Sequence, residues 1–248
     1  MKNKTDDKTN SDKKETVKIN NKNNNTDGKQ NKDNKKENII IFCAHSDDQI
    51  FGVGGTIAKY SKESKNITTI IFSYGESSHP WLKEKYTIKM RVQESEEAGK
   101  VVGCYENIFF GLEEFKFAQQ ILERNIKKKI KQIILDKKPT KIFTHSMNDP
   151  HKDHQDVYYC IASVLEEMKY KGDLYCFDVW NPINIKKRDE AQLYVDITKT
   201  FNLKLEALKC FKSQKLSMLS LLWSVYLRAS IHGRHSGVKY AERFFKLR

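Results

Sequence analysis

Proline, cysteine and long apolar runs are all scarce in this sequence, and each shortage excludes a class of protein. With only 4 prolines and 11 glycines among 248 residues, the chain is neither collagen-like nor mucin-like, and its overall composition does not fit a coiled coil. No stretch approaches the roughly 20 apolar residues that span a bilayer, so we do not expect a transmembrane protein. The first residues are charged and polar without an apolar segment, so we also expect no signal peptide.

The 5 cysteines are odd in number and form no CxxC pair. This usage favours buried thiols over a disulfide framework, and it predicts a protein of a reducing compartment, the cytoplasm. The cysteines are Cys43, Cys104, Cys160, Cys176 and Cys210.

Positive charge is in excess, and part of the excess lies near the N-terminus. The chain has 45 Lys and Arg against 32 Asp and Glu, a net charge of +13. Residues 1–37 hold 11 lysines, 9 asparagines and 7 acids, so burial cannot offset an ordering entropy of about 1–2 kcal/mol per residue. We predict a disordered Lys/Asn-rich tail, 1–37, and one folded domain, 38–248. A solvated extension is favoured over a tether to nucleic acid or an anionic membrane, and without a nucleic-acid-binding motif we expect no nucleic-acid partner.

The rest of the chain alternates between two hydrophobic patterns. The continuous apolar run at 39–44 is typical of a strand buried on both faces, and segments with helical spacing separate such runs. The expected strands are 39–44, 67–72, 108–110, 141–144, 174–179 and 193–197. The expected helices are 55–64, 84–103, 117–137, 154–169 and 200–213. This order predicts a Rossmann-like α/β fold, a mostly parallel sheet with helices on both faces.

Histidine and aspartate gather after two of these strands. His45, Asp47 and Asp48 follow 39–44, and a second group follows 141–144. Because ligands of such sheets bind beyond the carboxyl ends of the strands, both groups are expected at one edge. The second group consists of His145, Asp149, His151, Asp153 and His154.

These residue types suit hydrolysis assisted by a divalent metal. A catalytic zinc typically has three protein ligands and lowers the pKa of a bound water toward about 7. A carboxylate that is not a ligand can accept the proton of that water, and a histidine can stabilise the oxyanion. Alone, Asp47 and Asp48 could form a turn or helix cap, and His151 and His154 could lie on a solvated helical face. Two loops with complementary ligands favour the metal site.

The stretch AHSDDQIFGVGG, with HSMNDPHKDH about a hundred residues later, resembles the PIG-L / LmbE family of zinc-dependent N-acetylglucosamine deacetylases. That family shows AHPDDE in its first motif and HxDH in its second. The resemblance extends to Arg91, Glu94 and Ala98, which match an R-x-x-E-x-x-x-A segment, and to the closing YAExF at 240–244. It therefore covers about 38–248.

The resemblance implies a role for each motif residue. Asp47 would be the general base, His151 would stabilise the tetrahedral intermediate, and Asp153 would orient His151. Arg91 is similar to a family arginine that contacts the substrate. The Zn²⁺ ligands that the resemblance implies are His45, Asp48 and His154.

Two residues depart from the family pattern. Ser46 stands where the family has Pro, which removes a rigid φ but no ligand. Gln49 stands where it has Glu, and the loss of a charge beside metal ligands can cost about 10–100-fold in metal affinity or activity. A catalytically weakened sugar-binding scaffold is therefore one alternative to an active enzyme.

Three other features have two interpretations each. The glycines in 52–55 favour close helix packing over phosphate binding, because the G-x-G-x-x-G spacing and a Walker lysine are missing. The amphipathic stretches in 200–228 favour a helix that packs on the sheet or covers the site over peripheral contact with a membrane. Arg234 and His235 are candidate contacts for a phosphate or a sugar.

The sequence thus predicts a zinc-dependent hydrolase that removes the acetyl group from an N-acetylglucosamine-containing substrate, with a metal-activated water as the nucleophile. The expected partner is a small-molecule or lipid-linked N-acetylated amino sugar. The alternative enzyme is a zinc amidohydrolase that acts on another N-acyl substrate.

Overall fold

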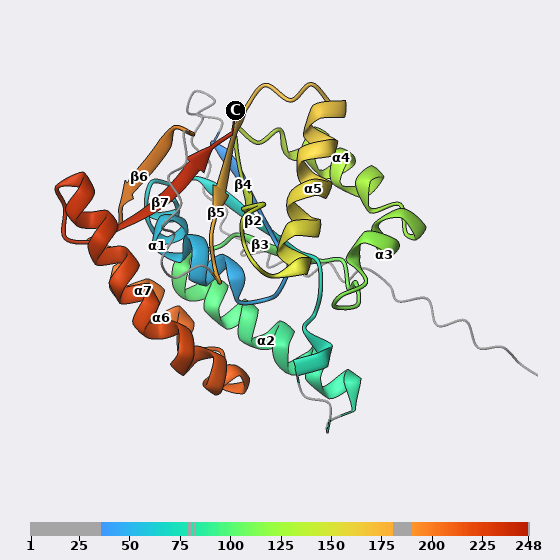
Figure 1. Ribbon diagram of the computed structural model, residues 1–248, viewed down its shortest axis with the longest axis horizontal. Coiled ribbons are helices and arrows are strands. Elements are labelled where there is room, and N and C mark those ends of the chain that lie inside the picture. The colour runs from blue at the N-terminus through green and yellow to red at the C-terminus, as the bar shows by residue number, and fades with distance from the viewer. Residues whose placement is uncertain (1–35, 79–80, 82, 181–189, 248) are drawn as a thin grey trace, which may run out of the picture.

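The computed structural model describes residues 36–78, 81, 83–180 and 190–247, which form a sheet between two layers of helices (Figure 1). The expected tail, 1–37, lies outside these ranges up to residue 35. The strands are β1 (Asn38–Cys43), β2 (Asn66–Ile71), β3 (Glu106–Phe109), β4 (Lys141–His145), β5 (Asp173–Phe177), β6 (Gln192–Asp196) and β7 (Ala241–Lys246). The helices are α1 (Asp48–Lys62), α2 (Glu84–Val102), α3 (Phe117–Glu123), α4 (Ile126–Lys137), α5 (Lys152–Glu167), α6 (Phe201–Leu208) and α7 (Lys215–Ser236), with short 3₁₀ turns at Glu76–Ser78 and Lys212–Gln214.

The sheet has the strand order β3-β2-β1-β4-β5-β7-β6. The first five strands in this order run parallel, whereas β7 pairs antiparallel with both β5 and β6. The predicted Rossmann-like, mostly parallel sheet with helices on both faces is confirmed.

Strand β1 lies inside the sheet and shows why a continuous apolar run is needed there. Ile39, Ile41 and Cys43 face one core, together with α1, α2, α6 and α7. Ile40 and Phe42 face the other core, which α3, α4 and α5 cover. Successive side chains of a strand point to opposite faces of the sheet. Because both faces of β1 are covered by helices, the side chains on both faces must be apolar.

The site lies where the chain changes the direction in which it adds strands to the sheet. From β1 the chain adds β2 and β3 on one side, and it then crosses to β4 on the other side of β1. The register Ile41↔Phe143 brings the carboxyl ends of β1 and β4 side by side. Such a switch point opens a crevice beyond the strand ends, which is where ligands bind in open α/β sheets.

Several predicted elements differ in extent. The predicted helix 117–137 is two helices, since Asn125 adopts φ 50° and breaks the helical path between α3 and α4. Asparagine tolerates this left-handed conformation better than most residues. The helix predicted at 55–64 begins earlier, at Asp48, and the predicted 200–213 ends at Leu208. Strand β7 was expected only as a motif, YAExF, and not as a strand.

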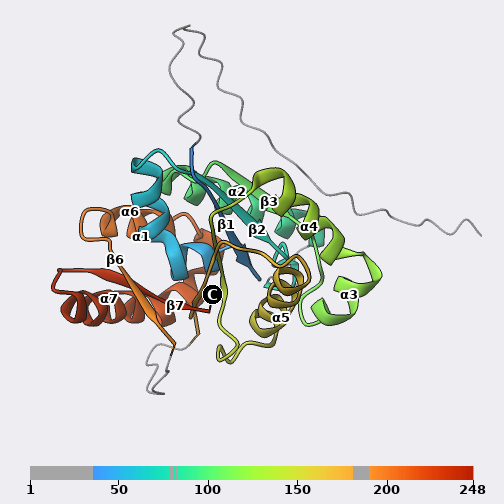
Figure 2. The same ribbon diagram turned by 90° about the horizontal axis from the view of Figure 1, so that it is seen from above.

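Helix α7 runs beside β6 and β7, as Figure 2 shows from above. Its buried Leu221, Val225 and Ala229 join the core shared with α1 and α2, which agrees with a helix packed on the sheet. Among the residues described, no helix combines the length and apolar character needed to cross a bilayer.

Candidate metal centre

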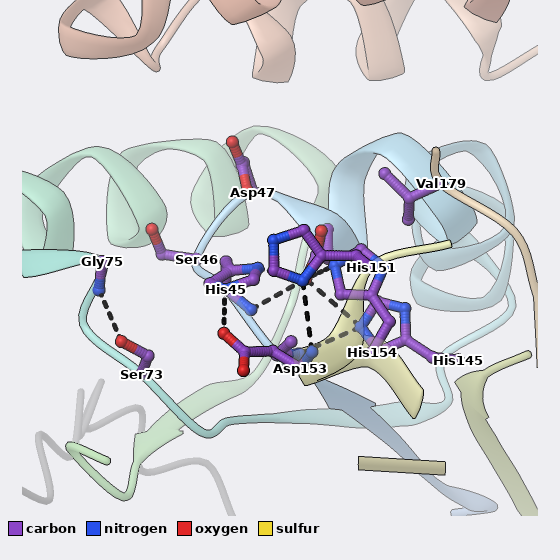
Figure 3. A network of polar contacts seen from close by, with 12 residues as sticks. His45, Ser46, Asp47, Ser73, Gly75, His145, His151, Asp153, His154 and Val179 are labelled. Atoms are coloured by element: carbon purple, nitrogen blue, oxygen red, sulfur yellow. Dashed lines mark hydrogen bonds and ion pairs between the residues drawn. The ribbon is translucent and has the colours of Figure 1, made fainter. Parts of the chain in front are cut away.

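The two histidine–aspartate groups meet at the carboxyl ends of β1 and β4 (Figure 3). His45 lies in the turn after β1, and Asp48 is the first residue of α1. His145 ends β4, and His154 lies in the first turn of α5. The candidate ligand atoms of His45, Asp48 and His154 all lie within 4.8 Å of one another.

The Asp48 carboxylate is the centre of this group. Its Oδ2 accepts a hydrogen bond from the His45 backbone amide at 2.8 Å. The same oxygen lies 3.2 Å from His145 Nε2, 3.4 Å from His154 Nε2 and 3.5 Å from His45 Nδ1. Burial alone would raise the pKa of Asp48, but the neighbouring His154 and His145 hold it well below its usual value. Asp48 is therefore ionised and can act as a ligand.

The surroundings of this group stabilise positive charge. Burial opposes protonation of His45 and His154, yet adjacent carboxylates raise the pKa of His45 to about 10 and that of His154 to about 9. The negative charge that favours protons on these two imidazoles would also favour a divalent cation. Such a cation would compete with the protons for the same nitrogen atoms.

Two acceptor atoms of the centre, His145 Nε2 and Asp48 Oδ2, face each other at 3.2 Å. His145 Nε2 accepts a hydrogen bond from the Ala44 amide at 3.0 Å, and burial and His154 lower the pKa of His145 to about 4. Neutral His145 thus presents an acceptor 3.2 Å from the ionised Asp48 oxygen. The buried His154 Nε2 lies 3.4 Å from Asp48 Oδ2 and makes no hydrogen bond within the part of the chain that the structure describes. Two facing acceptors, such as His145 Nε2 and Asp48 Oδ2, fit a bound cation, so the donor set agrees with a divalent metal such as zinc.

Asp149 supports the centre from behind. Its Oδ1 lies 3.0 Å from His154 Nδ1, and its Oδ2 accepts hydrogen bonds from the backbone amides of Val179 and Trp180. Burial opposes ionisation, but His154 and His145 hold the pKa of Asp149 well below its usual value. A carboxylate on the far nitrogen of a metal-binding histidine fixes the tautomer that leaves the near nitrogen free.

His151 and Asp153 lie at the beginning of α5. His151 occupies the N-cap, and its Nδ1 accepts a hydrogen bond from the Asp153 amide at 3.2 Å. The Asp153 carboxylate contacts other groups, namely the Phe115 amide at 3.0 Å and His45 Nε2 at 3.3 Å. Asp153 thus contacts His151 through its backbone and His45 through its side chain. Burial, together with His45 and His154, lowers the pKa of His151, so this imidazole is neutral near pH 7.

Asp47 and Arg91 face the same cavity from the opposite side, and Figure 3 shows the Asp47 carboxylate apart from the imidazoles. Asp47 Oδ2 lies 3.8 Å from Arg91 Nη2. Burial raises the pKa of Asp47 and the Asp48 charge adds to this, although Arg91 opposes it. Asp47 occupies the N-cap of α1 but makes no side-chain cap hydrogen bond, so its carboxylate remains available.

The cavity has a volume of about 120 Å³. Arg234 and His235 do not line it: Arg234 is exposed on α7, and His235 lines a neighbouring cavity. The structure therefore brings together the residues of the two motifs and Arg91, but not these two. The lining residues include His45, Asp47, Asp48, Arg91, Glu114, His151, Trp180 and Leu221.

The sequence patterns do not point to Glu114 or Phe115, and they assign no role to Asp149 or His145. Glu114 Oε1 lies 3.6 Å from His45 Nε2. Phe115 stacks on His151 with ring centroids 5.6 Å apart, and its backbone has φ 63°, a left-handed conformation that is unfavourable for phenylalanine. No local pattern identifies these two, since only the return of the loop after β3 brings them to the site. Asp149 and His145 could have been found from their places in the second group.

Ser46 and Gln49, the two departures, lie behind the cavity. Gln49 is buried, and its Nε2 donates to the Ser46 carbonyl and to Ser95 Oγ. A carboxylate could not make these donations unless it was protonated. The structure thus gives Gln49 a role in joining α1 to α2, and it shows no contact between Gln49 and a candidate ligand among the described residues.

The glycines of α1 pack against neighbouring elements. A Cβ atom on Gly52 would lie 2.2 Å from the Phe177 ring, and one on Gly55 would lie 2.7 Å from Ile197. These contacts agree with the packing interpretation and not with a phosphate-binding loop.

Known proteins resemble both the sequence and the fold. The family model PIG-L, described as GlcNAc-PI de-N-acetylase, matches residues 40–165. The uncharacterized deacetylase YaiS of Escherichia coli K12 is 27% identical over 131 residues, which cover 50% of this chain and 66% of that relative. The 4-oxalmesaconate hydratase of Pseudomonas putida is 22% identical over 221 residues, which cover 82% of this chain and 81% of that enzyme.

Among solved structures, the N,N'-diacetylchitobiose deacetylase of Pyrococcus horikoshii superposes with a TM-score of 0.72 and 18% identity, covering 86% of this chain and 84% of that one. At this identity, the likeness shows the fold alone. The family match, in contrast, includes both histidine–aspartate motifs from His45 to His154 and half of the chain. The chain therefore belongs to the PIG-L (GlcNAc-PI de-N-acetylase) family.

Proposed function

We propose that this protein is a zinc-dependent amide hydrolase that removes the acetyl group from a small N-acetylated amino sugar containing N-acetylglucosamine. The observation that carries the proposal is the convergence of three candidate ligands at one point, of which His45 and Asp48 line a cavity together with a separate carboxylate, Asp47. Membership of a de-N-acetylase family and the deacetylases among the relatives support the same reaction.

His45, Asp48 and His154 would hold the metal. When bound, Zn²⁺ lowers the pKa of a coordinated water and polarises the carbonyl of the substrate. Asp149 would keep the proton of His154 on Nδ1, so that Nε2 is free to bind. Asp153, in contact with His45 Nε2, would orient that imidazole in the same way.

Asp47 would accept the proton of the attacking water. The carboxylate lies 3.8 Å from Arg91, and burial raises its pKa although the Arg91 charge opposes the increase, which favours a group that takes up a proton. Once protonated, Asp47 would give the proton to the nitrogen of the leaving amine, so one group would serve as base and then as acid. Arg91 would also orient the sugar.

His151 would stabilise the negative charge that develops on the carbonyl oxygen. The Asp153 amide donates to His151 Nδ1, so the neutral ring carries its proton on Nε2. A neutral donor at this place strengthens its hydrogen bond as charge develops in the transition state.

The test uses Asp47→Asn and acetate release from N,N'-diacetylchitobiose and N-acetylglucosamine. We expect about one zinc per chain in both proteins, with turnover in the variant lower by about 10²–10⁴-fold, the usual contribution of a general base. The matched control is Asp136→Asn, at a carboxylate on α4 that contacts Gln132. Turnover that survives in Asp47→Asn would exclude Asp47 as the base.

A second function merits a direct assay, because the 4-oxalmesaconate hydratase aligns with 82% of this chain. A metal and a general base that activate water can add it to a carbon–carbon double bond as well as to an amide. Wild-type protein that hydrates 4-oxalmesaconate and releases no acetate would replace the deacetylase proposal. Sugar binding without either product would identify a weakened scaffold, and acetate from other N-acyl compounds alone would identify a different amidohydrolase.

A further inference from the structure

A second cavity, of about 200 Å³, lies between α7, β7 and the end of β5. Strands β5 and β7 pair only at Tyr175↔Lys246 and Cys176↔Phe245, and beyond these pairs they diverge. Residues at the end of β5, in β7 and in α7 line the cavity. It shares Phe51 with the metal-centre cavity but none of the candidate metal ligands.

Cationic side chains line this cavity from three elements. Lys204 comes from α6, Arg228 from α7 and Arg243 from β7. Lys204 is neutralised locally, since its Nζ donates to Glu242 Oε1 at 2.6 Å and to the Phe51 carbonyl at 2.7 Å. The Glu242 carboxylate is engaged further by the Gly55 and Thr56 backbone amides. Glu242 therefore has little capacity left for the arginines.

The two guanidinium groups have no hydrogen-bonded carboxylate of this kind among the described residues, although the charges of Glu242 and of Asp178, which also lines the cavity, act on Arg228. Neither Arg228 nor Arg243 forms an ion pair with a carboxylate of the described residues. Arg228 Nη1 donates to the backbone carbonyl of Asp178 at 2.8 Å, and the guanidinium of Arg243 lies 4.8 Å from the centre of the Phe245 ring. The buried Arg243 Nε has no hydrogen-bond partner. Buried polar donors are seldom left unpaired, so these groups are suited to an additional acceptor.

The positive potential is visible in a neighbouring histidine. His232, one turn after Arg228 on α7, lines the same cavity. Burial and the adjacent Arg243 and Arg228 lower its pKa to about 3. The rings of His232 and His235, which both line the cavity, add hydrogen-bonding atoms without adding negative charge.

We propose that this cavity is a binding site for a small oxyanion, either free or as the terminal phosphate or carboxylate group of a metabolite, held by the guanidinium groups of Arg228 and Arg243. Guanidinium groups present planar pairs of N–H donors that match the oxygens of such anions. The volume accommodates a phosphate group with a few waters, since each water occupies about 30 Å³ of liquid. This site is independent of the proposed catalytic function.

The test measures binding of inorganic phosphate by calorimetry at low ionic strength, with the full chain and its bound metal. We expect one site per chain in the wild type. Arg243→Gln should weaken binding about 10–100-fold, the cost of losing a charge-assisted pair of hydrogen bonds. Lys199→Gln removes one exposed positive charge away from the cavity and should leave binding unchanged.

Further variants distinguish this site from the metal centre. Arg91→Gln alters the metal-centre cavity and should not weaken phosphate binding, whereas loss in Arg91→Gln but not in Arg243→Gln would overturn the proposal. Absence of phosphate binding in the wild type would overturn it too. Arg243→Lys keeps the charge but loses the planar fork, so weaker binding in this variant tests the site even if the glutamine variant fails to fold.

The source of the ligand is resolved by two more titrations. Glycerol 3-phosphate that competes with inorganic phosphate indicates a site for phosphomonoesters, and acetate that competes extends it to carboxylates. Phosphate binding without competition from either identifies a site for the free ion. Each of these results requires that Arg243→Gln weakens the same binding.

Discussion

Asp149 links the predicted metal ligand His154 to the loop after β5. Its Oδ2 accepts from the amides of Val179 at 3.0 Å and Trp180 at 3.2 Å. Its Oδ1 accepts from the His151 amide at 3.1 Å and lies 3.0 Å from His154 Nδ1. Asp149→Asn would keep the shape of the side chain but exchange one acceptor oxygen for an NH₂ donor.

The consequence follows from the two orientations of the amide. With its oxygen toward Val179 and Trp180, the NH₂ group donates to His154 Nδ1 and forces the ring proton onto Nε2, the atom that faces Asp48. A protonated Nε2 cannot bind a metal. In the other orientation, buried backbone amides face an NH₂ group, at a cost of about 1–3 kcal/mol for each unsatisfied donor. We therefore expect zinc affinity to fall by about 10–100-fold.

Zinc affinity is measured by competition with a chromophoric chelator, and the free energy of unfolding by urea denaturation of the metal-free protein. We expect the variant to lose about 1–3 kcal/mol in stability. Asp156→Asn is the matched control, since Asp156 lies nearby on α5 but pairs with Lys152. Wild-type zinc affinity in Asp149→Asn would refute the tautomer argument.

Three further predictions concern the metal centre and its support. His45 and His154 have pKa values of about 10 and about 9, and both must lose a proton to bind zinc. The zinc affinity should therefore fall by roughly 100-fold per pH unit as the pH is lowered from about 8 to about 6. A dissociation constant that does not change with pH in chelator competition would contradict this. Gly52→Ala should lower the free energy of unfolding in urea by about 1–3 kcal/mol, because the new Cβ would overlap the Phe177 ring and the cost exceeds the helix-propensity gain of about 1 kcal/mol. The control is Gly99→Ala on α2, where the nearest atom to the new Cβ is the Asn107 amide nitrogen at 3.1 Å, and this variant should lose less stability. Phe115→Gly should gain about 1 kcal/mol by relieving φ 63° but lower acetate release, since the ring no longer packs on His151; a less stable variant with full turnover would count against this role.

The sequence predicted the fold because its patterns are local consequences of burial. A run such as 39–44 must be apolar on both faces, and polar residues can follow it only where the strand leaves the core. Parallel strands end at one edge, so His45 and His154 were expected near each other although they are 109 positions apart in the numbering. The same logic failed at β7, which was noticed only as the motif YAExF, and at Asn125, where a single backbone conformation breaks a helix that the apolar spacing continues.

The sequence by itself determined the fold class, the family and which histidines and aspartates meet, because these depend on residue type and on the period of the pattern. Only the tertiary structure decided which atoms face each other. Asp153 contacts His45 with its carboxylate and His151 with its amide, and Phe115 reaches His151 from a loop that no periodicity describes. The two arginines of the second cavity, Arg228 and Arg243, likewise meet only because α7 and β7 pack together in the fold. Such contacts depend on the paths of loops and on strand register. Both are set jointly by side chains that lie far apart in the sequence.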